Sequence, residues 1–410
     1  MAESRKVVFF DGRYYRAASV PSWLTLEHFL FTHTLHYGGA AFEGGRGYPN
    51  KAKDDGTMNI IGLDMRVERL FRSLESLWMV QPAEPRRWWD GFARSHPKLA
   101  EKYAEFFASN AAKVGKRRAE MFPFTKAEVR EAIVRTLLLN VNSGNIDPKV
   151  GCYWRPLAWV GTRNDCSLGV FSLHNPKHFM VAAVPWGRYI GDLEFSRGAP
   201  VMVAEEGDSE DNRRNKLASN YATGQRLKNR ALVNSFAEML LTDKAPERNL
   251  LEGTGENLLF YEGKKQWCSP RQEGQPILPG TTLRTLVRML ELQGHTVRFR
   301  DIPLKEALDG RFKGAAMTGT AAEVTPLCLI YDPLTDRAVE LGVPEELKTI
   351  QAQYLDMVHS LKVPASLKKL QAELITEVRW DNAKHAGLAS QVVTQQPPAK
   401  GAVKEAALTQ

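Results

Sequence analysis

The sequence has few cysteines and no long apolar run. Its 410 residues include 4 cysteines, which stand singly: Cys152, Cys166, Cys268 and Cys328. They show neither the paired spacing of a zinc site nor the density of a disulfide-stapled domain, so we expect a reducing compartment. No apolar stretch approaches the roughly 20 residues that span a bilayer, and the N-terminus lacks the apolar core of a signal peptide. A cytoplasmic protein without a membrane partner is expected.

Several catalytic signatures are also missing. The sequence contains no phosphate loop that ends in Gly-Lys-Ser/Thr, no HExxH motif, and no dinucleotide fingerprint between a strand and a helix. His33 and His36 have a spacing that could ligate a metal from a helix, but the glycines that follow argue against a helix. No third ligand is close in sequence, so no metal site is expected.

What is present is an ordinary globular composition. The chain is 43% hydrophobic and 25% charged, and its length allows two domains with sizeable cores. The net charge of +8 could attract anionic ligands or nucleic acid. The basic residues are spread along the chain rather than gathered in one block, so a solvated surface is favoured and no nucleic-acid partner is expected.

Local patterns predict an α/β fold. "VVFFDGRYYR" predicts a hairpin around Asp11-Gly12, a pair that suits a type I′ turn. "HFMVAAVPW" has the continuous apolar character of a buried strand. "LPGTTLRTLVRMLELQG" predicts a helix that starts after Pro279-Gly280 and ends before Gly294. Strands and helices therefore alternate along most of the chain.

These patterns suggest two domains. We expect a smaller N-terminal α/β domain over residues 1–160, with a helical insertion at about 81–125. A linker over residues 161–175 would lead to a larger C-terminal domain over residues 176–345. Residues 346–410 would form a helical extension and a flexible, polar tail.

Eight short motifs occur in a fixed order along the chain: "HTLHYGGAAFEGGRGY", "ERL", "YWRPL", "PWGRYIG", "NKLASNY", "EGTGENL", "LPGTT" and "GTAAEVTP". Each alone has a plain structural explanation, such as an exposed lysine, a solvated turn or a helix cap. Together they resemble the branched-chain-amino-acid aminotransferases of fold type IV, which use pyridoxal 5′-phosphate (PLP). The resemblance covers roughly residues 5 to 345. It implies a two-domain, D-amino-acid aminotransferase-like fold with PLP in the cleft between the domains.

By the resemblance, the residues that contact the reactive end of the cofactor come from separate motifs. Lys216 matches the lysine that holds PLP covalently and then moves a proton between substrate and cofactor. Such an amine must have its pKa lowered by burial or by nearby positive charge. Glu252 matches the carboxylate that keeps the pyridine nitrogen protonated, with Glu256 as its rival, which we treat as structural. Tyr221 matches the tyrosine that hydrogen-bonds the phenolic oxygen.

The phosphate end is matched by a helix start. A helix N-terminus offers unpaired amides and a favourable dipole to an anion. The resemblance places the phosphate against Arg69, which would supply a full positive charge, and against three hydroxyl residues, Thr281, Thr282 and Thr320.

The remaining motif residues match a substrate pocket. The glycines around residue 40 let the backbone pass close to a ligand. By the resemblance, rings hold an aliphatic side chain, and the amides of the turn that starts at Thr320 bind the α-carboxylate. An arginine orients the rings and could also orient a substrate carboxylate. The matching residues are Tyr37, Phe42, Arg46, Tyr153, Ala321 and Ala322.

The implied reaction is reversible transfer of an amino group from L-leucine, L-isoleucine or L-valine to 2-oxoglutarate. The resemblance also implies a homodimer in which a partner loop helps to close each pocket. Two alternatives stay open. One is a same-fold enzyme acting on D-amino acids, (R)-amines or aminodeoxychorismate; the other is a noncatalytic, basic ligand- or nucleic-acid-binding protein.

The sequence departs from the family pattern at four places. Arg66 stands where the family commonly has histidine, and the 81–125 insertion is unusual. The segment before Lys216 lacks the usual proline, and the chain continues beyond about residue 362. These departures bear on substrate range and access.

Overall fold

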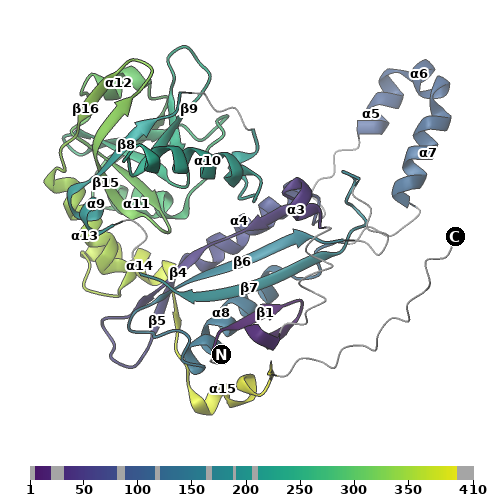
Figure 1. The fold of residues 1–410 in the computed structure, drawn as a ribbon, viewed down its shortest axis with the longest axis horizontal. Coiled ribbons are helices and arrows are strands. Elements are labelled where there is room, and N and C mark those ends of the chain that lie inside the picture. The colour runs from purple at the N-terminus through teal and green to yellow at the C-terminus, as the bar shows by residue number, and fades with distance from the viewer. Residues whose placement is uncertain are drawn as a thin grey trace.

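Two β-sheets divide the protein into two lobes (Figure 1). The computed structural model describes residues 5–19, 32–80, 88–115, 121–162, 169–187, 191–205 and 211–394. Within these residues each sheet has nine strands. The first runs in the order β17-β5-β4-β6-β7-β1-β2-β18, with β3 beside β6, and the second in the order β10-β9-β8-β15-β14-β11-β12-β13, with β16 beside β15. The mixed α/β fold expected from the sequence is confirmed.

The first lobe packs helices against a largely antiparallel sheet. Trp154, Phe179 and Ile60 are fully buried in its core, and the alternating burial along β6 and β7 shows that one face of these strands meets it. Its strands are β1 (Val7–Phe10), β2 (Arg13–Arg16), β3 (Ala40–Phe42), β4 (Gly45–Pro49), β5 (Met58–Ile61), β6 (Cys152–Val160), β7 (Lys177–Pro185), β17 (Ile375–Val378) and β18 (Val392–Val393). Its helices are η1 (Ala17–Ser19), α3 (His33–Tyr37), α4 (Leu63–Ser76), α8 (Lys126–Asn142) and α15 (Asn382–Ala389).

The core of the second lobe includes Phe260, Trp267 and Leu286, and around Trp267 and Leu286 it also takes in Tyr48 and Ile61 of the first sheet. Its strands are β8 (Ala199–Val203), β9 (Glu238–Thr242), β10 (Leu250–Gly253), β11 (Asn257–Gly263), β12 (Gln266–Pro270), β13 (Thr296–Arg300), β14 (Gly314–Gly319), β15 (Glu323–Asp332) and β16 (Arg337–Glu340). Its helices are α9 (Asp192–Arg197), η2 (Asp211–Arg214), α10 (Asn220–Val233), α11 (Thr281–Leu292), α12 (Leu304–Leu308), α13 (Glu345–Val358), η3 (Ala365–Leu367) and α14 (Lys368–Leu374).

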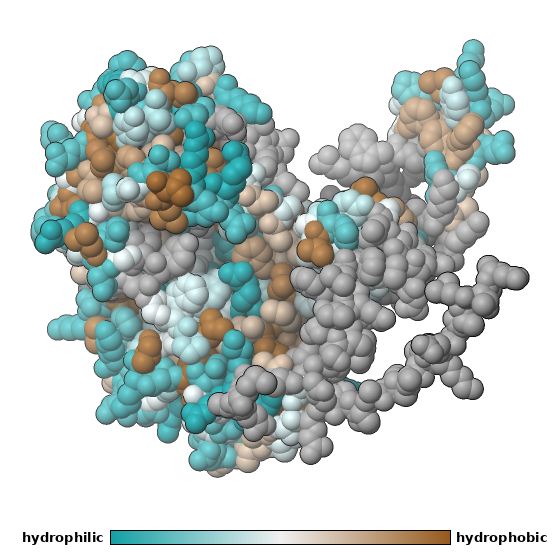
Figure 2. Space-filling model, in the orientation of Figure 1, coloured by the Kyte–Doolittle hydropathy of each residue, from teal (hydrophilic) through white to brown (hydrophobic). Residues whose placement is uncertain are grey.

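The insertion forms a helical arm that projects from the first lobe (Figure 1). It contains α5 (Trp88–Ser95), α6 (Pro97–Lys102) and α7 (Ala104–Gly115). The rings of Phe92 and Phe107 join α5 to α7, with their centroids 5.8 Å apart. Figure 2 shows apolar and polar residues mixed on the arm's surface, where Phe106 is 68% exposed.

The expected boundary at residue 176 is wrong. β7 pairs along its whole length with β6, from Cys152 opposite Pro185 to Val160 opposite Lys177, and so belongs to the first sheet. The apolar run predicted the strand but not its partner, which is the preceding strand β6 in antiparallel pairing. The second sheet begins with β8. Likewise, α13 and α14 pack into the second core while β17 pairs with β5 of the first sheet, so residues 346–378 tie both lobes together.

The segment at residues 33–37 is a helix, contrary to the expectation from its glycines. Thr32 caps its start, and Gly38 ends it at φ 67°, so the glycine terminates the helix rather than preventing it. The ring of His33 donates from Nε2 to the Gly169 carbonyl at 2.6 Å and accepts from Asn175 at Nδ1 at 3.0 Å. Across the described ranges, no group of three potential ligands is placed to hold a metal. In the same ranges, no helix combines the length and apolar character needed to cross a bilayer.

Candidate active site

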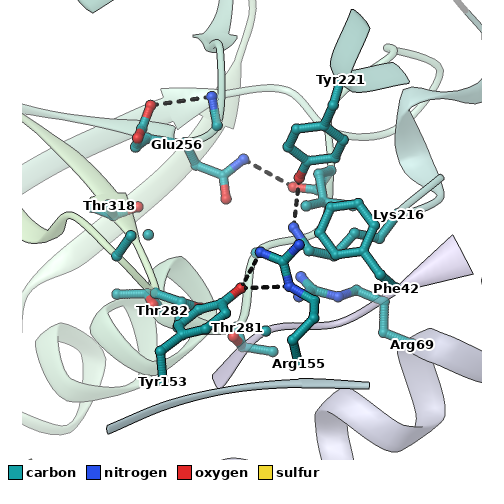
Figure 3. A pocket seen from close by; sticks show the side chains of 18 of the residues that line it. Phe42, Arg69, Tyr153, Arg155, Lys216, Tyr221, Glu256, Thr281, Thr282 and Thr318 are labelled. Carbon is teal, nitrogen blue, oxygen red and sulfur yellow. Dashed lines mark hydrogen bonds between the residues drawn. The ribbon is translucent and has the colours of Figure 1, made fainter. Parts of the chain in front are cut away.

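A cavity of about 430 Å³ lies between the two lobes (Figure 3). Phe42 and Tyr153 line it from the first sheet, and Thr281 lines it from the start of α11. Lys216 and Tyr221 line it from the loop before α10 and from α10 itself. A smaller cavity of about 30 Å³ adjoins it and shares Tyr221, Gly255, Glu256, Asn257 and Leu278 with it. Motifs far apart in the sequence therefore meet in one place.

Lys216 is fixed by its backbone and leaves its amine in the cavity. Its N–H donates to the Ser73 hydroxyl at 2.9 Å, and its carbonyl accepts from the Phe42 N–H at 3.1 Å. The Nζ atom donates to the Tyr221 hydroxyl at 2.5 Å. Burial, together with the charge of Arg69, lowers the pKa of Lys216 to about 8. A substantial fraction of the amine is therefore neutral near physiological pH and able to act as a nucleophile or a base.

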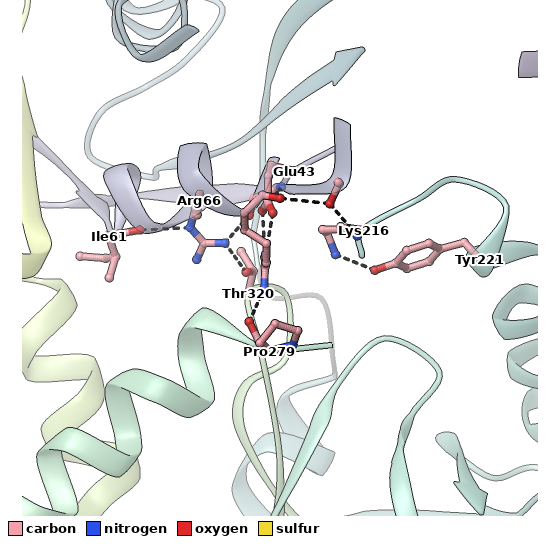
Figure 4. A network of polar contacts seen from close by, with 10 residues as sticks. Glu43, Ile61, Arg66, Lys216, Tyr221, Pro279 and Thr320 are labelled. Carbon is pink, nitrogen blue, oxygen red and sulfur yellow. Dashed lines mark hydrogen bonds and ion pairs between the residues drawn. The ribbon is translucent and has the colours of Figure 1, made fainter. Parts of the chain in front are cut away.

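Arg69 lines the same cavity and is held by the buried carboxylate of Glu43, which Figure 4 labels together with Pro279. Its Nε and Nη2 atoms donate to the two oxygens of Glu43 at 2.6 and 2.8 Å, and Nη1 donates to the Pro279 carbonyl at 3.0 Å. Burial alone would raise the pKa of Glu43, but the Arg69 guanidinium outweighs it and holds the pKa below its ordinary value. This pair connects α4 to the segment that precedes α11.

The start of α11 is an anion-binding environment. The N-cap residue Gly280 offers no side-chain cap, so the first amides of the helix have no side-chain acceptor there. In the described part of the chain, the hydroxyl oxygens of Thr281 and Thr318 are buried without a hydrogen-bond partner, and both residues line the cavity. A Cβ on Gly280 would lie 1.9 Å from Asn257 Oδ1, so only glycine fits there. These donors fit a phosphate group.

The two carboxylates of "EGTGEN" have different surroundings. Glu252 Oε2 accepts from Asn257 Nδ2 at 3.2 Å and from the Leu278 N–H at 3.1 Å. Glu252 Oε1 lies 3.9 Å from the Arg213 guanidinium. Glu256 is buried near Glu238, and burial and that neighbour raise the pKa of Glu256 to about 8. Glu252 therefore has the contacts that suit a carboxylate anion, and Glu256 does not.

Aromatic rings and one cation form the other end of the cavity. Tyr153, Arg155 and Leu157 follow alternate positions of β6 and share its cavity face. Arg155 donates from Nε and Nη2 to Tyr153 Oη at 3.0 and 2.6 Å, and its guanidinium lies 4.4 Å from the centre of the Phe42 ring. Trp186 packs on Tyr153, with their ring centroids 5.1 Å apart. Arg155 and Trp186 lie in the motifs "YWRPL" and "PWGRYIG" but were not among the expected site residues, although strand alternation from Tyr153 points to Arg155.

Comparison with known proteins identifies the family. The model of the amino-transferase class IV family matches residues 58–330. The chain belongs to this family. It is similar to the branched-chain-amino-acid aminotransferase of Pseudomonas aeruginosa, with 25% identity over 80% of this chain and 85% of that protein. It is also similar to a probable branched-chain-amino-acid aminotransferase of Synechocystis sp., with 27% identity over 81% and 91%.

Solved structures of branched-chain aminotransferases share the fold. The enzyme of Thermobaculum terrenum in its PLP form aligns with a TM-score of 0.65 and 18% identity, over 92% of this chain and 99% of that one. The enzyme of Thermoproteus uzoniensis with norvaline aligns with a TM-score of 0.66 and 19% identity, over 91% and 99%. The two-lobed architecture is therefore that of this enzyme family.

Three residues expected at the substrate end do not line the cavity of this class IV amino-transferase within one chain. Tyr37 lies on α3 with 47% of its side chain exposed. Arg46 faces Tyr153 across β4 and β6, but its Nη1 donates to Glu323 at 2.8 Å and its guanidinium stacks on Tyr48. Ala322 is buried in the second core. The other expected residues line the main cavity, apart from Glu252, which lines the adjoining one: Phe42, Arg69, Tyr153, Lys216, Tyr221, Thr281, Thr282, Thr320 and Ala321.

Proposed function

We propose that this protein is a PLP-dependent aminotransferase that moves an amino group reversibly between branched-chain L-amino acids and 2-oxoglutarate. One observation carries the proposal. The Lys216 amine, with a pKa of about 8, lies 2.5 Å from Tyr221 in a cavity that also holds an uncapped helix start. The similarity to the Pseudomonas and Synechocystis relatives supports the substrate class.

The residues present fit the cofactor. Thr281 and Thr282 would hold its phosphate at the start of α11, together with Thr320 and with Arg69, which donates to the Pro279 carbonyl just before that helix. Glu252 would hold the proton on the ring nitrogen from the adjoining cavity, and Tyr221 would donate to the phenolic oxygen. When bound, PLP supplies an electron sink for the charge that develops when the substrate's α-carbon loses its proton.

The chain's own chemistry then rests mainly on Lys216. Its amine takes the proton from the substrate's α-carbon and later returns one, as general base and then general acid. A pKa of about 8 suits both directions, since the neutral and protonated forms are both populated near pH 7–8. Tyr221 orients the amine, because its hydroxyl oxygen accepts a hydrogen bond from Nζ.

The end of the cavity formed by the rings and Arg155 suits both kinds of substrate. Phe42, Tyr153 and Trp186 offer an apolar surface to an aliphatic side chain. Arg155, already bonded to Tyr153, offers a cation to the second carboxylate of 2-oxoglutarate. The turn at Thr320 and Ala321 would bind the α-carboxylate through backbone amides.

We also propose that the protein is a homodimer and acts in the cytoplasm. Apolar side chains are exposed on α3 and on the nearby segment after residue 169: Leu35 is 51% exposed, Tyr37 47%, Val170 78% and Phe171 53%. The hydrogen bond from His33 to Gly169 joins these two segments. A second chain covering them would bury Tyr37 and remove the apolar surface from water.

The test is the visible absorbance of PLP-treated wild type and Lys216→Ala. We expect a band in the wild type only, which L-leucine bleaches and D-leucine leaves unchanged, with the branched 2-oxo acid as product. A band that responds to D-leucine instead would favour the D-amino-acid or (R)-amine alternative. The absence of a lysine-dependent band, with nucleic-acid binding that falls steeply with salt, would favour a noncatalytic protein.

A further inference from the structure

Arg66 is a buried arginine that the proposed chemistry does not use. It lies on α4, 4% exposed, one helical turn before Arg69. Its Nε donates to the Ile61 carbonyl at 3.1 Å, and its Nη1 donates to the Gly44 carbonyl at 2.5 Å and to the Thr320 hydroxyl at 2.9 Å (Figure 4). All three acceptors are neutral. Among the residues that the structure describes, no carboxylate forms an ion pair with Arg66.

The local charges do not balance. Burial lowers the pKa of Arg66, and the nearby charge of Arg69 lowers it further, against the opposing charge of Glu43. Both carboxylate oxygens of Glu43 accept hydrogen bonds from Arg69. Two guanidinium groups therefore share one carboxylate, which leaves one positive charge in a buried place. A buried charge without a counter-ion is costly, so this cluster favours a bound anion.

Thr320 connects that charge to the cavity. Its hydroxyl oxygen accepts from Arg66, and the residue itself lines the cavity. A hydroxyl that accepts a hydrogen bond from a cation keeps its own hydrogen for another acceptor and becomes a stronger donor. The hydrogen bond also crosses from α4 of the first lobe to the turn between β14 and β15 of the second.

We propose that Arg66 is a positioning residue for the cofactor's phosphate, acting through Thr320. Arg66 holds the Thr320 hydroxyl so that its hydrogen is free to be donated. Arg66 also supplies a positive charge, since the charge of Arg69 is balanced by Glu43. This inference rests on the proposed function and adds a residue at a position where the family resemblance leads one to expect histidine, which carries less charge at neutral pH.

The test compares two ligands that differ only in the phosphate. Apo protein is titrated with PLP and with pyridoxal, and the dissociation constants are obtained from the absorbance change. For Arg66→Met we expect PLP to bind about tenfold or more weakly, while the dissociation constant for pyridoxal changes less than about twofold. Arg66→Lys should recover part of the difference, since it restores the charge without the planar fork.

Two further variants make the comparison specific. Arg248→Met removes another arginine that bonds a backbone carbonyl and a carboxylate, away from the cavity, and should leave both constants unchanged. Thr320→Val keeps Arg66 but removes the bridging hydroxyl, and should weaken PLP selectively. If Arg66→Met does not fold, Arg66→Lys decides: it keeps the charge but not the planar fork that holds Thr320, so PLP should bind more weakly than in the wild type while pyridoxal does not.

Each remaining outcome counts against the proposal. Equal weakening of PLP and pyridoxal would mean that Arg66 only supports the fold. Unchanged PLP affinity in Arg66→Met and Thr320→Val, with a normal lysine-dependent band, would remove the role of Arg66 and leave the proposed function standing. A wild type that binds no PLP would overturn both.

Discussion

The lowered pKa of Lys216 sets how fast the apo protein can capture PLP. Only the neutral amine attacks a carbonyl, and burial with the charge of Arg69 brings the pKa to about 8 from an ordinary 10.5. The capture rate should therefore rise about tenfold per pH unit below pH 8 and level off above it. Stopped-flow absorbance from pH 6 to 10 would measure this, with free Nα-acetyl-lysine as the comparison. A rate that keeps rising to pH 10 in the protein would contradict the burial argument.

Arg155 should decide the amino acceptor more than the donor. Its guanidinium faces the cavity beside Tyr153 and Phe42. For Arg155→Met we expect KM for 2-oxoglutarate to rise on the order of tenfold or more, because the second carboxylate loses its cation, while KM for L-leucine changes less than about threefold. Steady-state assays with each substrate varied would measure both. Equal effects on the two KM values would instead indicate general damage to the cavity.

Single residues also show where sequence reasoning stops. Lys216, Tyr221 and Thr281 could be predicted because short motifs carry them, and the structure brings them to one cavity. The roles of Tyr37 and Arg46 could not be read in the same way, because exposure and ion pairing depend on the partners that tertiary packing supplies. Glu323, whose carboxylate forms an ion pair with the Arg46 guanidinium, lies in another motif far along the chain.

At the scale of elements, the turn between β10 and β11 holds a buried carboxyl that favours the protonated form. Burial and Glu238 raise the pKa of Glu256 to about 8 from an ordinary 4.5, and Glu256 Oε2 accepts from the Gly255 N–H at 3.1 Å. Since the folded-state pKa is raised, this group's stabilisation is complete below pH 4.5 and is lost as the pH rises through 8. The wild type should therefore lose stability as the pH rises between these values.

Glu256→Gln tests that turn, because the amide keeps an acceptor and cannot ionise. Between pH 5 and pH 9, the free energy of unfolding should fall by about 2 kcal/mol less in the variant than in the wild type. Urea unfolding at several pH values would measure the difference. Glu247→Gln changes the same charge at an exposed site of the same lobe and should follow the wild type. Parallel curves for Glu256→Gln and the wild type would show that Glu256 titrates normally.

Elements with strong local signals were predictable. The β1–β2 hairpin turns at Asp11 and Gly12 with φ of 42° and 89°, as the pair suggested. The predicted helix after Gly280 is α11, which ends at Leu292. The sheet to which β7 belongs was not predictable, because an apolar strand carries no local signal of its partner. The same holds for β17, which joins a strand more than 300 residues earlier in the chain.

At the scale of the whole molecule, the segment after α13 fastens one lobe to the other. Leu367, Leu370 and Leu374 are buried in the second core. Directly after them, β17 pairs with β5, from Ile375 opposite Ile61 to Val378 opposite Met58, and Val378 enters the first core. The backbone N–H of Gly62, at the start of α4, also donates to the Leu374 carbonyl at 2.8 Å. α4 carries both Arg66 and Arg69, so this segment also supports the phosphate end of the cavity.

Truncation tests this connection. A chain that ends at residue 374 loses β17 and the apolar contacts of Val378, Trp380, Leu388 and Val392 with the first core. Uncovering these side chains should cost about 3 kcal/mol or more, which lowers Tm by about 4 °C or more in a chain of this length, and PLP should bind more weakly because α4 loses its support. A chain that ends at residue 394 keeps every described element and serves as the control, with Tm within about 2 °C of the full chain. Calorimetry of both chains, with and without PLP, measures these effects. If the shorter chain and the control have the same Tm, β17 does not contribute to stability. The contact between the lobes would then depend on the residues that line the cavity.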